Sequence, residues 1–251
     1  MTRARIGVAA GLGMSLAGAA LLAAGCQSTQ ATSAQREAEG QKLIKSEKGL
    51  VVKQKNKDIE VVDTTLLSDK NGTAVVVEVK NTSDQGYAHV PIAIDVSDAK
   101  GKTVFKNNVP GLAPALTEIP AIGPGETFDW VHDQILATGE PDEVEATIGA
   151  GGEELPASPP EIELTNPTLK QDQFSGVEAT GEAENKSQVE QRDVTVFAVA
   201  RDGNRIVAAG RGGLRRLEAD PDHGTPYHVF FIGDPEGADI EVTAPPVQLQ
   251  P

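Results

Sequence analysis

The chain has 251 residues, enough for one large domain or two small ones, and a formal net charge of -15 at pH 7. Such an acidic surface repels phosphate backbones, and no basic segment with interleaved aromatic residues offsets it, which argues against nucleic-acid binding. The single cysteine, Cys26, excludes an intramolecular disulfide and a cysteine-based zinc site.

Residues 1–25 have the pattern of an export signal. Arg3 and Arg5 supply positive charge at the start, and residues 6–24 are uncharged and rich in Ala, Leu and Gly. A polar stretch rich in Gln, Ser and Thr follows. We therefore predict that residues 1–25 form a signal peptide that directs the chain out of the cytoplasm.

The segment Leu21–Cys26, which reads LLAAGC, resembles the lipobox of bacterial lipoproteins. Ala23 stands where leucine is commonest in that signal, and Leu22 lies one position earlier. The resemblance implies cleavage between Gly25 and Cys26 and lipidation of Cys26, whose acyl chains would hold the protein on a membrane. Two alternatives stay open at this point. The segment can be an uncleaved anchor, because about 20 apolar residues suffice to span a bilayer, or the cysteine can be coincidental.

Residues 26–57 are predicted to form a polar tether. The segment is mixed in charge and has few large apolar residues, so it lacks the apolar surface needed to order itself. A flexible spacer of about 30 residues has a typical reach on the order of 30 Å. Such a tether would lift a folded part off the membrane surface.

Residues 58–150 are predicted to form a first β-sandwich domain. Segments rich in β-branched residues, several of them alternating between apolar and polar, recur with turn residues between them. The expected strands are residues 59–67, 73–80, 90–96, 103–105, 127–131 and 143–148. Strands at this spacing, separated by Gly and Pro turns, favour a sandwich.

Residues 151–160 are predicted to form a Gly/Pro linker, and residues 161–247 a second β-sandwich domain. The linker belongs to the stretch GAGGEELPASPP at residues 149–160, a composition from which no regular element is expected. The fold class predicted from the sequence is therefore all-β, with two tandem immunoglobulin-like β-sandwich domains after the signal peptide and tether.

The second predicted domain repeats the first. The matched segments, in chain order, are Val79–Ser83 with Ala183–Ser187, Ile92–Asp95 with Val194–Phe197, Lys100–Val104 with Asp202–Ile206, Phe128 with Phe230, and Val144–Thr147 with Ile240–Thr243. The second, third and fourth pairs share an offset of 102 residues. Five matches in the same order indicate two similar domains.

The repeated pattern resembles the FxLYD-type, immunoglobulin-like domains of bacterial lipoproteins and other cell-envelope proteins. It consists of a strand ending in Asn-x-Ser/Thr-like residues, an alternating strand, a Gly turn, and a later aromatic strand after a Gly/Pro turn. The resemblance covers residues 58–150 and 161–246, and the aromatic motif that names the family is not recognisable in either. It implies a sandwich fold and an envelope context, and it supplies no catalytic residues.

No segment has the spacing of a known catalytic or metal site. The four histidines form no His-Glu-x-x-His pattern, no Gly-x-Ser-x-Gly elbow occurs, and neither glycine-rich run is followed by the Lys-Ser/Thr of a phosphate loop. His132 and Asp133, beside Trp130, suggest a polar site, but a strand end that leaves the core has the same residues. We therefore predict no catalytic residues, no metal ligands and no cofactor.

One candidate for partner contact is the apolar connection at residues 107–123. Leu112 and Leu116 within it can cap the sandwich or form an exposed patch that a partner covers. The first role is the expected one.

A second candidate for partner contact is the one basic spot of this acidic chain, Arg211, Arg215 and Arg216. These arginines cluster near a glycine run in the predicted connection at residues 210–225. They can meet a carboxylate or a lipid head group, or they can belong to a solvated hairpin.

The sequence therefore predicts a non-catalytic binding or structural module, anchored to the cell membrane by acylated Cys26 and facing outside the cytoplasm. Its partners would be the membrane and another envelope protein or polymer. The rival hypothesis is an envelope hydrolase or ligand-carrying protein with a site between the two domains. A pocket that gathers His132, Asp133 or Arg215 with carboxylates would support the rival.

Overall fold

The computed structural model describes residues 49–165, 167–172, 176–220 and 223–250, all of which belong to one compact unit, residues 47–251. Apart from a short 3-10 helix, η1 (Pro114–Leu116), the regular structure of these residues is β-strand, so the all-β prediction is confirmed. None of the helical structure in the described ranges is long and apolar enough to cross a membrane. The predicted signal peptide, Cys26 and most of the predicted tether lie outside the described residues.

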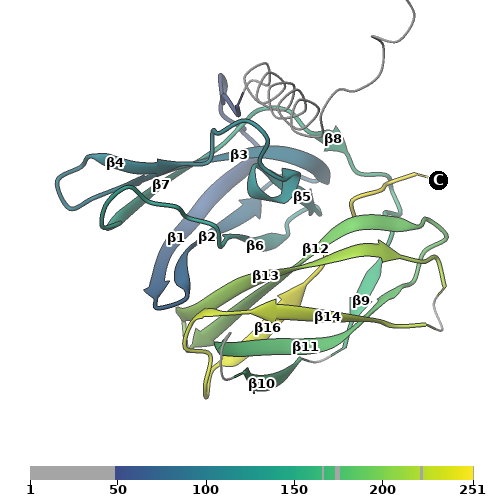
Figure 1. Cartoon of the computed structure of the whole chain (residues 1–251). Helices are drawn as coiled ribbons and strands as arrows, with labels where there is room; N and C mark the ends of the chain where they lie inside the picture. Colours follow the sequence, from purple (N-terminus) through teal and green to yellow (C-terminus); the bar gives the residue numbers. More distant parts are fainter. Residues whose placement is uncertain (1–48, 166, 173–175, 221–222, 251) are drawn as a thin grey trace, which may run out of the picture. The chain divides into compact units, whose positions relative to one another are not determined.

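The first half of the described chain is a sandwich of two antiparallel sheets (Figure 1). One sheet has the strand order β1 (Ile59–Asp69), β2 (Gly72–Asn81), β6 (Thr127–His132). The other is built around β3 (Tyr87–Ser97), whose partners are β4 (Thr103–Lys106), β5 (Glu118–Ile122), β7 (Glu143–Ile148) and β8 (Glu153–Glu154). Every second residue of β3 is buried, because one face of this strand lies on the core.

The second half is also a sandwich of two antiparallel sheets. One contains β9 (Ile162–Leu164), β10 (Thr168–Asp172), β11 (Gly176–Asn185) and β14 (Thr225–Phe230). The other has the order β15 (Ile232–Gly233), β13 (Arg205–Leu217), β12 (Gln191–Asp202), β16 (Asp239–Thr243). Tandem sandwiches were therefore predicted correctly.

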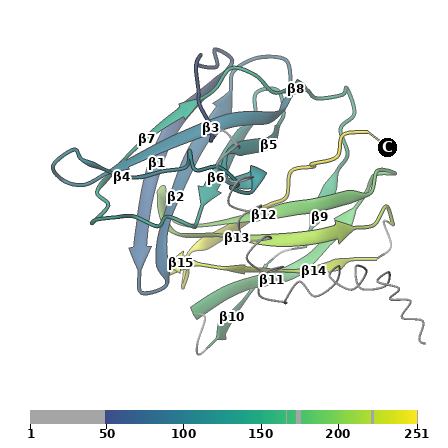
Figure 2. The ribbon, with the colours of Figure 1, turned by 45° about the horizontal axis from the view of Figure 1, so that its top comes forward.

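The strands β12 and β13 are buried on both faces, so the two sandwiches share them as a layer. Residues 196–200 of β12 are all buried. Phe197 and Val199 belong to the core of the first sandwich, whereas Val196 and Ala198 belong to the core of the second. A strand covered on both faces needs an apolar run without alternation, as this one has. In Figure 1 and Figure 2, β12 and β13 lie between β6 and β14.

The predicted C-terminal boundary of the tether, residue 57, lies too far along the chain, because the described residues before it pair with the first sandwich. The backbone N–H of Asn56 donates to the carbonyl of Ile148 (2.9 Å), and that of Ala150 donates to the carbonyl of Gln54 (2.7 Å). A polar segment can extend a sheet edge through backbone atoms alone. The paired residues Gln54 and Asn56 are polar, so the apolar pattern of the sequence did not reveal this pairing.

The predicted linker, residues 151–160, contains a regular element after all. β8 pairs with β3, with Glu153 opposite Ala88 and Glu154 opposite Tyr87. The backbone N–H of Leu155 then donates to the carbonyl of Gly86 (2.9 Å). The linker is thus partly fastened to the first sandwich, again through backbone hydrogen bonds that composition does not encode.

Hydrogen bonds at the ends of β2 and β11 reveal the repeat in the structure. The side-chain amide of Asn81 donates to the carbonyl of Gln85 (2.7 Å), and that of Asn185 donates to the carbonyl of Val189 (2.8 Å). The two asparagines therefore hold equivalent turns, at an offset of 104 residues.

The same offset continues into β3 and β12, so the predicted match of these two strands is wrong by two residues. β3 pairs with β7 so that Ala93 lies opposite Thr147, and β12 pairs with β16 so that Phe197 lies opposite Thr243. The turn between β12 and β13 is tighter than the turn between β3 and β4. Phe105 of β4, opposite Val96, therefore corresponds to Ala208 of β13, opposite Ala200, so the offset after the turn is 103 residues and the predicted 102 is one residue short there as well.

Phe230 does not occupy the place of Phe128, as the repeat had suggested. Phe128 is buried, whereas Phe230 is 45% exposed. The pairing of β6 with β2 and of β14 with β11 instead makes Trp130 equivalent to Tyr227. Both side chains are buried and donate hydrogen bonds to backbone carbonyls. Matching aromatic residues by type failed because strand register follows the face that lies on the core.

The glycine run at residues 210–213 was predicted to lie in a connection or hairpin. It lies inside β13 instead. β13 passes close to β14 there. A Cβ on Gly210 would lie 2.0 Å from the carbonyl oxygen of Phe230, and a Cβ on Gly212 would lie 2.1 Å from that of His228. These two glycines thus allow the backbones of the two sheets to approach each other.

We expect Gly212→Ala to lower the free energy of unfolding by about 2 kcal/mol or more, because the added methyl group would force β13 and β14 apart. Gly213→Ala is the matched control, since nothing lies within 4 Å of a Cβ at that position. Urea denaturation of both variants measures the difference. Equal effects of the two substitutions would contradict the close approach.

Candidate functional site

The seam, where β12 and β13 pack against the first sandwich, contains the strongest candidate for a site. The rings of Phe128 and Phe197 meet edge to face across it, with centroids 5.1 Å apart. Val199, Ile206 and Ala209 extend this contact into the core of the first sandwich. The middle of the seam is therefore formed by apolar side chains.

Two arginines of the second half bind carboxylates of the first half beside this contact. Arg201 donates from its two terminal nitrogens to the two oxygens of Asp129, at 2.7 and 2.9 Å, and also to Glu78 at 3.2 Å. The Asp129 carboxylate raises the pKa of Arg201. Arg211 donates its side-chain Nε and Nη2 to one oxygen of Asp133, at 2.9 and 2.6 Å. These paired contacts fix the orientation of each arginine.

The predicted basic spot is therefore not a free patch. The side chain of Arg211 is only 9% exposed and bound to Asp133, so its predicted role in partner contact is wrong. Arg216 is more exposed but binds Glu190 at 2.5 Å. Arg215 is exposed, and a partner contact there stays a prediction. The sequence shows that these arginines are close together in the chain, but it does not show which carboxylates pack against them in the fold.

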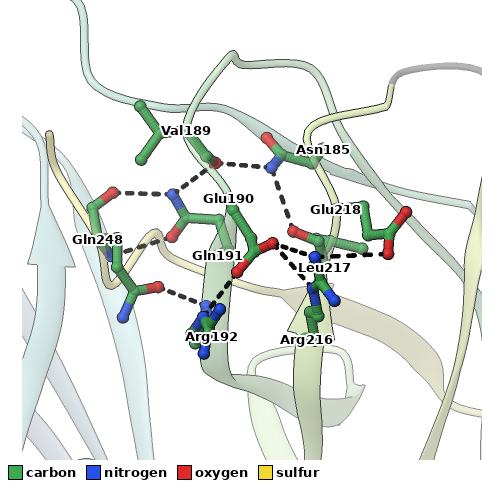
Figure 3. Close-up of polar contacts among 9 residues, drawn as sticks. All are labelled: Asn185, Val189, Glu190, Gln191, Arg192, Arg216, Leu217, Glu218 and Gln248. Atoms are coloured by element: carbon green, nitrogen blue, oxygen red, sulfur yellow. Dashed lines mark hydrogen bonds and ion pairs between the residues drawn. The ribbon is translucent and has the colours of Figure 1, made fainter. Parts of the chain in front are cut away.

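Glu190, which directly precedes β12, lies between two arginines (Figure 3). It accepts hydrogen bonds from the side chains of Arg192 (2.6 Å) and Arg216 (2.8 Å). These hydrogen bonds lower the pKa of Glu190. The positive charges are thus largely compensated within the chain itself.

The apolar connection at residues 107–123 caps the first sandwich, which confirms the expected role of Leu116. That side chain is 2% exposed, so its alternative role in partner contact is excluded. Leu112 is half-buried. Asn107, also buried, donates its side-chain amide to the carbonyls of Ile92 (2.9 Å) and Leu116 (2.8 Å). The connection also contains η1 and β5, and is therefore a structured wall.

This wall forms one side of an apolar groove of about 440 Å³ at one end of the seam, hereafter the seam groove. Ala113, Pro114, Ala115 and Pro120 line that side. The second half contributes Val247 and Gln248, which follow β16, and Asp193 and Thr195 of β12. His89, Glu118 and Arg192 complete the lining. A volume of 300–1,000 Å³ is typical of small-molecule sites.

Both sides of the seam groove are held by buried polar side chains. The indole N–H of Trp130 donates to the carbonyls of Ala115 (3.1 Å) and Glu118 (2.9 Å). The Gln191 side chain donates to the carbonyl of Gln248 in the segment after β16 (2.8 Å), as Figure 3 shows. It also accepts from the backbone N–H of Val247 (2.9 Å). The groove is thus formed before any ligand arrives.

Two residues of the groove have a left-handed backbone, His89 with φ 53° and Asp193 with φ 51°. They are equivalent in the repeat, at the offset of 104 residues. Each lies three or four residues before its strand starts to pair with a further strand. β3 pairs with β7 from Ile92 onward, and β12 pairs with β16 from Phe197 onward. The kink is therefore a property of the fold, and both residues line the groove.

His132 is buried in the core and does not face the seam groove. Its ring packs edge-on against Phe105 and Trp130, and its Nε2 has no hydrogen-bond partner among the described residues. Burial, with a smaller contribution from the charge of Arg211, lowers the pKa of His132 to about 3. It is therefore neutral at physiological pH and enclosed, so it does not form a polar site together with Asp133.

In the described ranges, no group of three or more His, Cys, Asp or Glu side chains is arranged to hold a metal ion. The groove itself offers apolar walls and a rim of hydrogen-bonding and charged groups. Such a surface can bind a ligand by shape and charge. The sequence did not reveal this groove. His89 and Asp193, which lie at its rim, are far apart in the chain and are related only by the register of the repeat.

Comparison of the sequence with known protein families finds no matching family model, and comparison with curated proteins finds no significant match. The function of the chain is therefore inferred from its own residues and geometry.

We expect Asp133→Asn to lower the free energy of unfolding by about 2 kcal/mol or more, because it leaves the Arg211 guanidinium largely buried without its counter-charge. Asp202→Asn is the control. It removes a carboxylate from an exposed pair with Arg205 and should change stability by less than about 1 kcal/mol. Urea denaturation measures both. If the two variants were equally stable, the Arg211–Asp133 pair at the seam would contribute no more to stability than an exposed pair.

We expect His132 to make the fold sensitive to acid. Between pH 6.5 and 3 the unfolded chain binds a proton at this residue and the folded chain does not, so the free energy of unfolding falls as the pH falls. From pH 7 to pH 5 this one group should account for a loss of about 2 kcal/mol.

The variant His132→Phe should lack that contribution, since the phenyl ring keeps the contacts with Phe105 and Trp130 but binds no proton. Urea denaturation at pH 7 and pH 5 measures the loss of stability of the two proteins. Both contain the same carboxylates, so the effect of carboxylate protonation cancels when the two losses are subtracted. Parallel losses of stability would contradict a buried neutral imidazole.

Proposed function

We propose that this chain is a lipid-anchored, extracytoplasmic binding or structural module of a bacterial cell envelope, without catalytic activity. The observation that carries the proposal is the position of Cys26, directly after a charge-free segment and before a polar stretch. Acyl chains on Cys26 would attach the chain to the membrane, at about 0.8 kcal/mol for each buried methylene group. The described sandwiches begin more than twenty residues later, which leaves room for a spacer.

The two sandwiches are proposed to be immunoglobulin-like domains of the FxLYD type. Their two-sheet architecture and the repeated asparagine turns support this relationship. Domains of this kind present edges and loops to a partner. The partner proposed here is another protein or a polymer of the envelope.

The residues at the seam favour binding over hydrolysis. A hydrolytic site built from the residues that the sequence singled out would need them accessible as acid or base, whereas Asp133 is engaged by Arg211 and His132 is enclosed in the core. A second candidate function, a ligand-carrying protein, is favoured by the seam groove, which lies between the two halves.

We expect the protein extracted from membranes to have the mass of a chain that begins at Cys26 and carries diacylglycerol, with or without a further acyl group. The Cys26→Ala variant, expressed in the same bacterium, should carry no acyl mass. Intact-mass spectrometry measures both. A wild-type chain that keeps residues 1–25 and lacks acyl mass would overturn the anchor, and these residues would then be an uncleaved membrane segment.

A further inference from the structure

We propose that the seam groove binds a small organic cation, a ligand with an apolar body and one ammonium group. This inference specifies the ligand of the binding role proposed above, and it does not depend on the lipid anchor. Its basis is the combination of apolar sides with carboxylates at the rim, in a groove whose sides are already in place.

The sides of the groove select an apolar body. Pro114, Ala115 and Pro120 on one side and Val247 on the other present carbon atoms and no charge. These residues are small or rigid, so little side-chain freedom is lost when a ligand covers them. Removing apolar surface from water there gives about 25 cal/mol for each square ångström buried.

The charged groups at the rim favour a cation. The carboxylate of Asp193 makes no hydrogen bond or ion pair with any described residue, and the carboxylate of Glu118 is paired only with the imidazole of His89, at 3.3 Å. The one arginine of the lining, Arg192, is bound to Glu190. An arriving ammonium group therefore meets two carboxylates that no lysine or arginine neutralises. The net charge of -15 attracts cations over longer distances as well.

The groove is preorganised, which lowers the cost of binding. Trp130 holds Ala115 and Glu118 in place, and Gln191 holds Val247 and Gln248. Trp130 is also the only tryptophan of the chain. Since its indole N–H bonds to two residues of the groove, a ligand that shifts these residues would change its fluorescence.

The experiment titrates the purified full chain with octylamine, octanol and octanoate, which share one apolar body and differ in the head group. Tryptophan fluorescence and isothermal calorimetry follow binding in parallel, so a ligand that leaves the fluorescence unchanged is still detected. We expect octylamine to bind most tightly. Equal binding of octanol, tighter binding of octanoate, or no binding of octylamine by either method would overturn the proposal.

Variants connect the binding to the groove. Asp193→Asn should weaken octylamine binding about two- to fivefold, the scale of one exposed charge pair, and asparagine tolerates the left-handed backbone at this position. Asp202→Asn, at the other end of the same strand, should leave it unchanged. Ala113→Phe should abolish it by filling the groove. If Asp193→Asn and Ala113→Phe both bound octylamine as the wild type does, the site would lie elsewhere.

The Cys26→Ala variant separates this proposal from the lipid anchor. It should bind octylamine with the affinity of the wild type, whatever the mass analysis shows. A wild-type chain that lacks acyl mass but binds octylamine would show that the anchor has failed, and an acylated wild-type chain that does not bind octylamine would show that the groove proposal has failed.

Discussion

The shared layer of β12 and β13 is the feature on which the rest of this structure depends. Its two faces serve two cores, so the halves cannot separate without exposing Phe197 and Val199 to water. The arginine pairs orient the two halves but add little to the free energy of folding, since much of the attraction in such a pair is offset by loss of hydration. Apolar packing thus holds the halves together, and Arg201 and Arg211 fix their orientation.

The seam groove is a consequence of that fixed orientation. One side comes from the first sandwich and the other from the segment after β16, so neither half contains the groove alone. A groove between two halves that moved freely would have to be assembled at each binding event. Here the indole of Trp130 and the amide of Gln191 hold its two sides within the folded unit. Stability and a binding surface thus have one origin.

The sequence predicted what depends on alternation and composition, and missed what depends on contact between distant segments. Alternation predicted β3 and the sandwich class, and the apolar connection predicted that Leu116 caps the core. The run from Val196 to Ala200 showed no alternation, yet its meaning, a layer shared by two sandwiches, requires knowing what covers each face. Pairing through backbone atoms, as at Asn56 and Glu153, leaves no trace in side-chain composition.

The kinks at His89 and Asp193 separate what the fold requires from what a ligand can use. Both halves need a left-handed residue where the strand changes its neighbours, and glycine would meet that need without strain. Yet each position carries a polar side chain, of types that tolerate this backbone better than most. The fold thus explains the backbone, but it does not explain why a histidine and a carboxylate occur there. Both side chains line the same groove, so a role in recognition accounts for what the fold leaves unexplained.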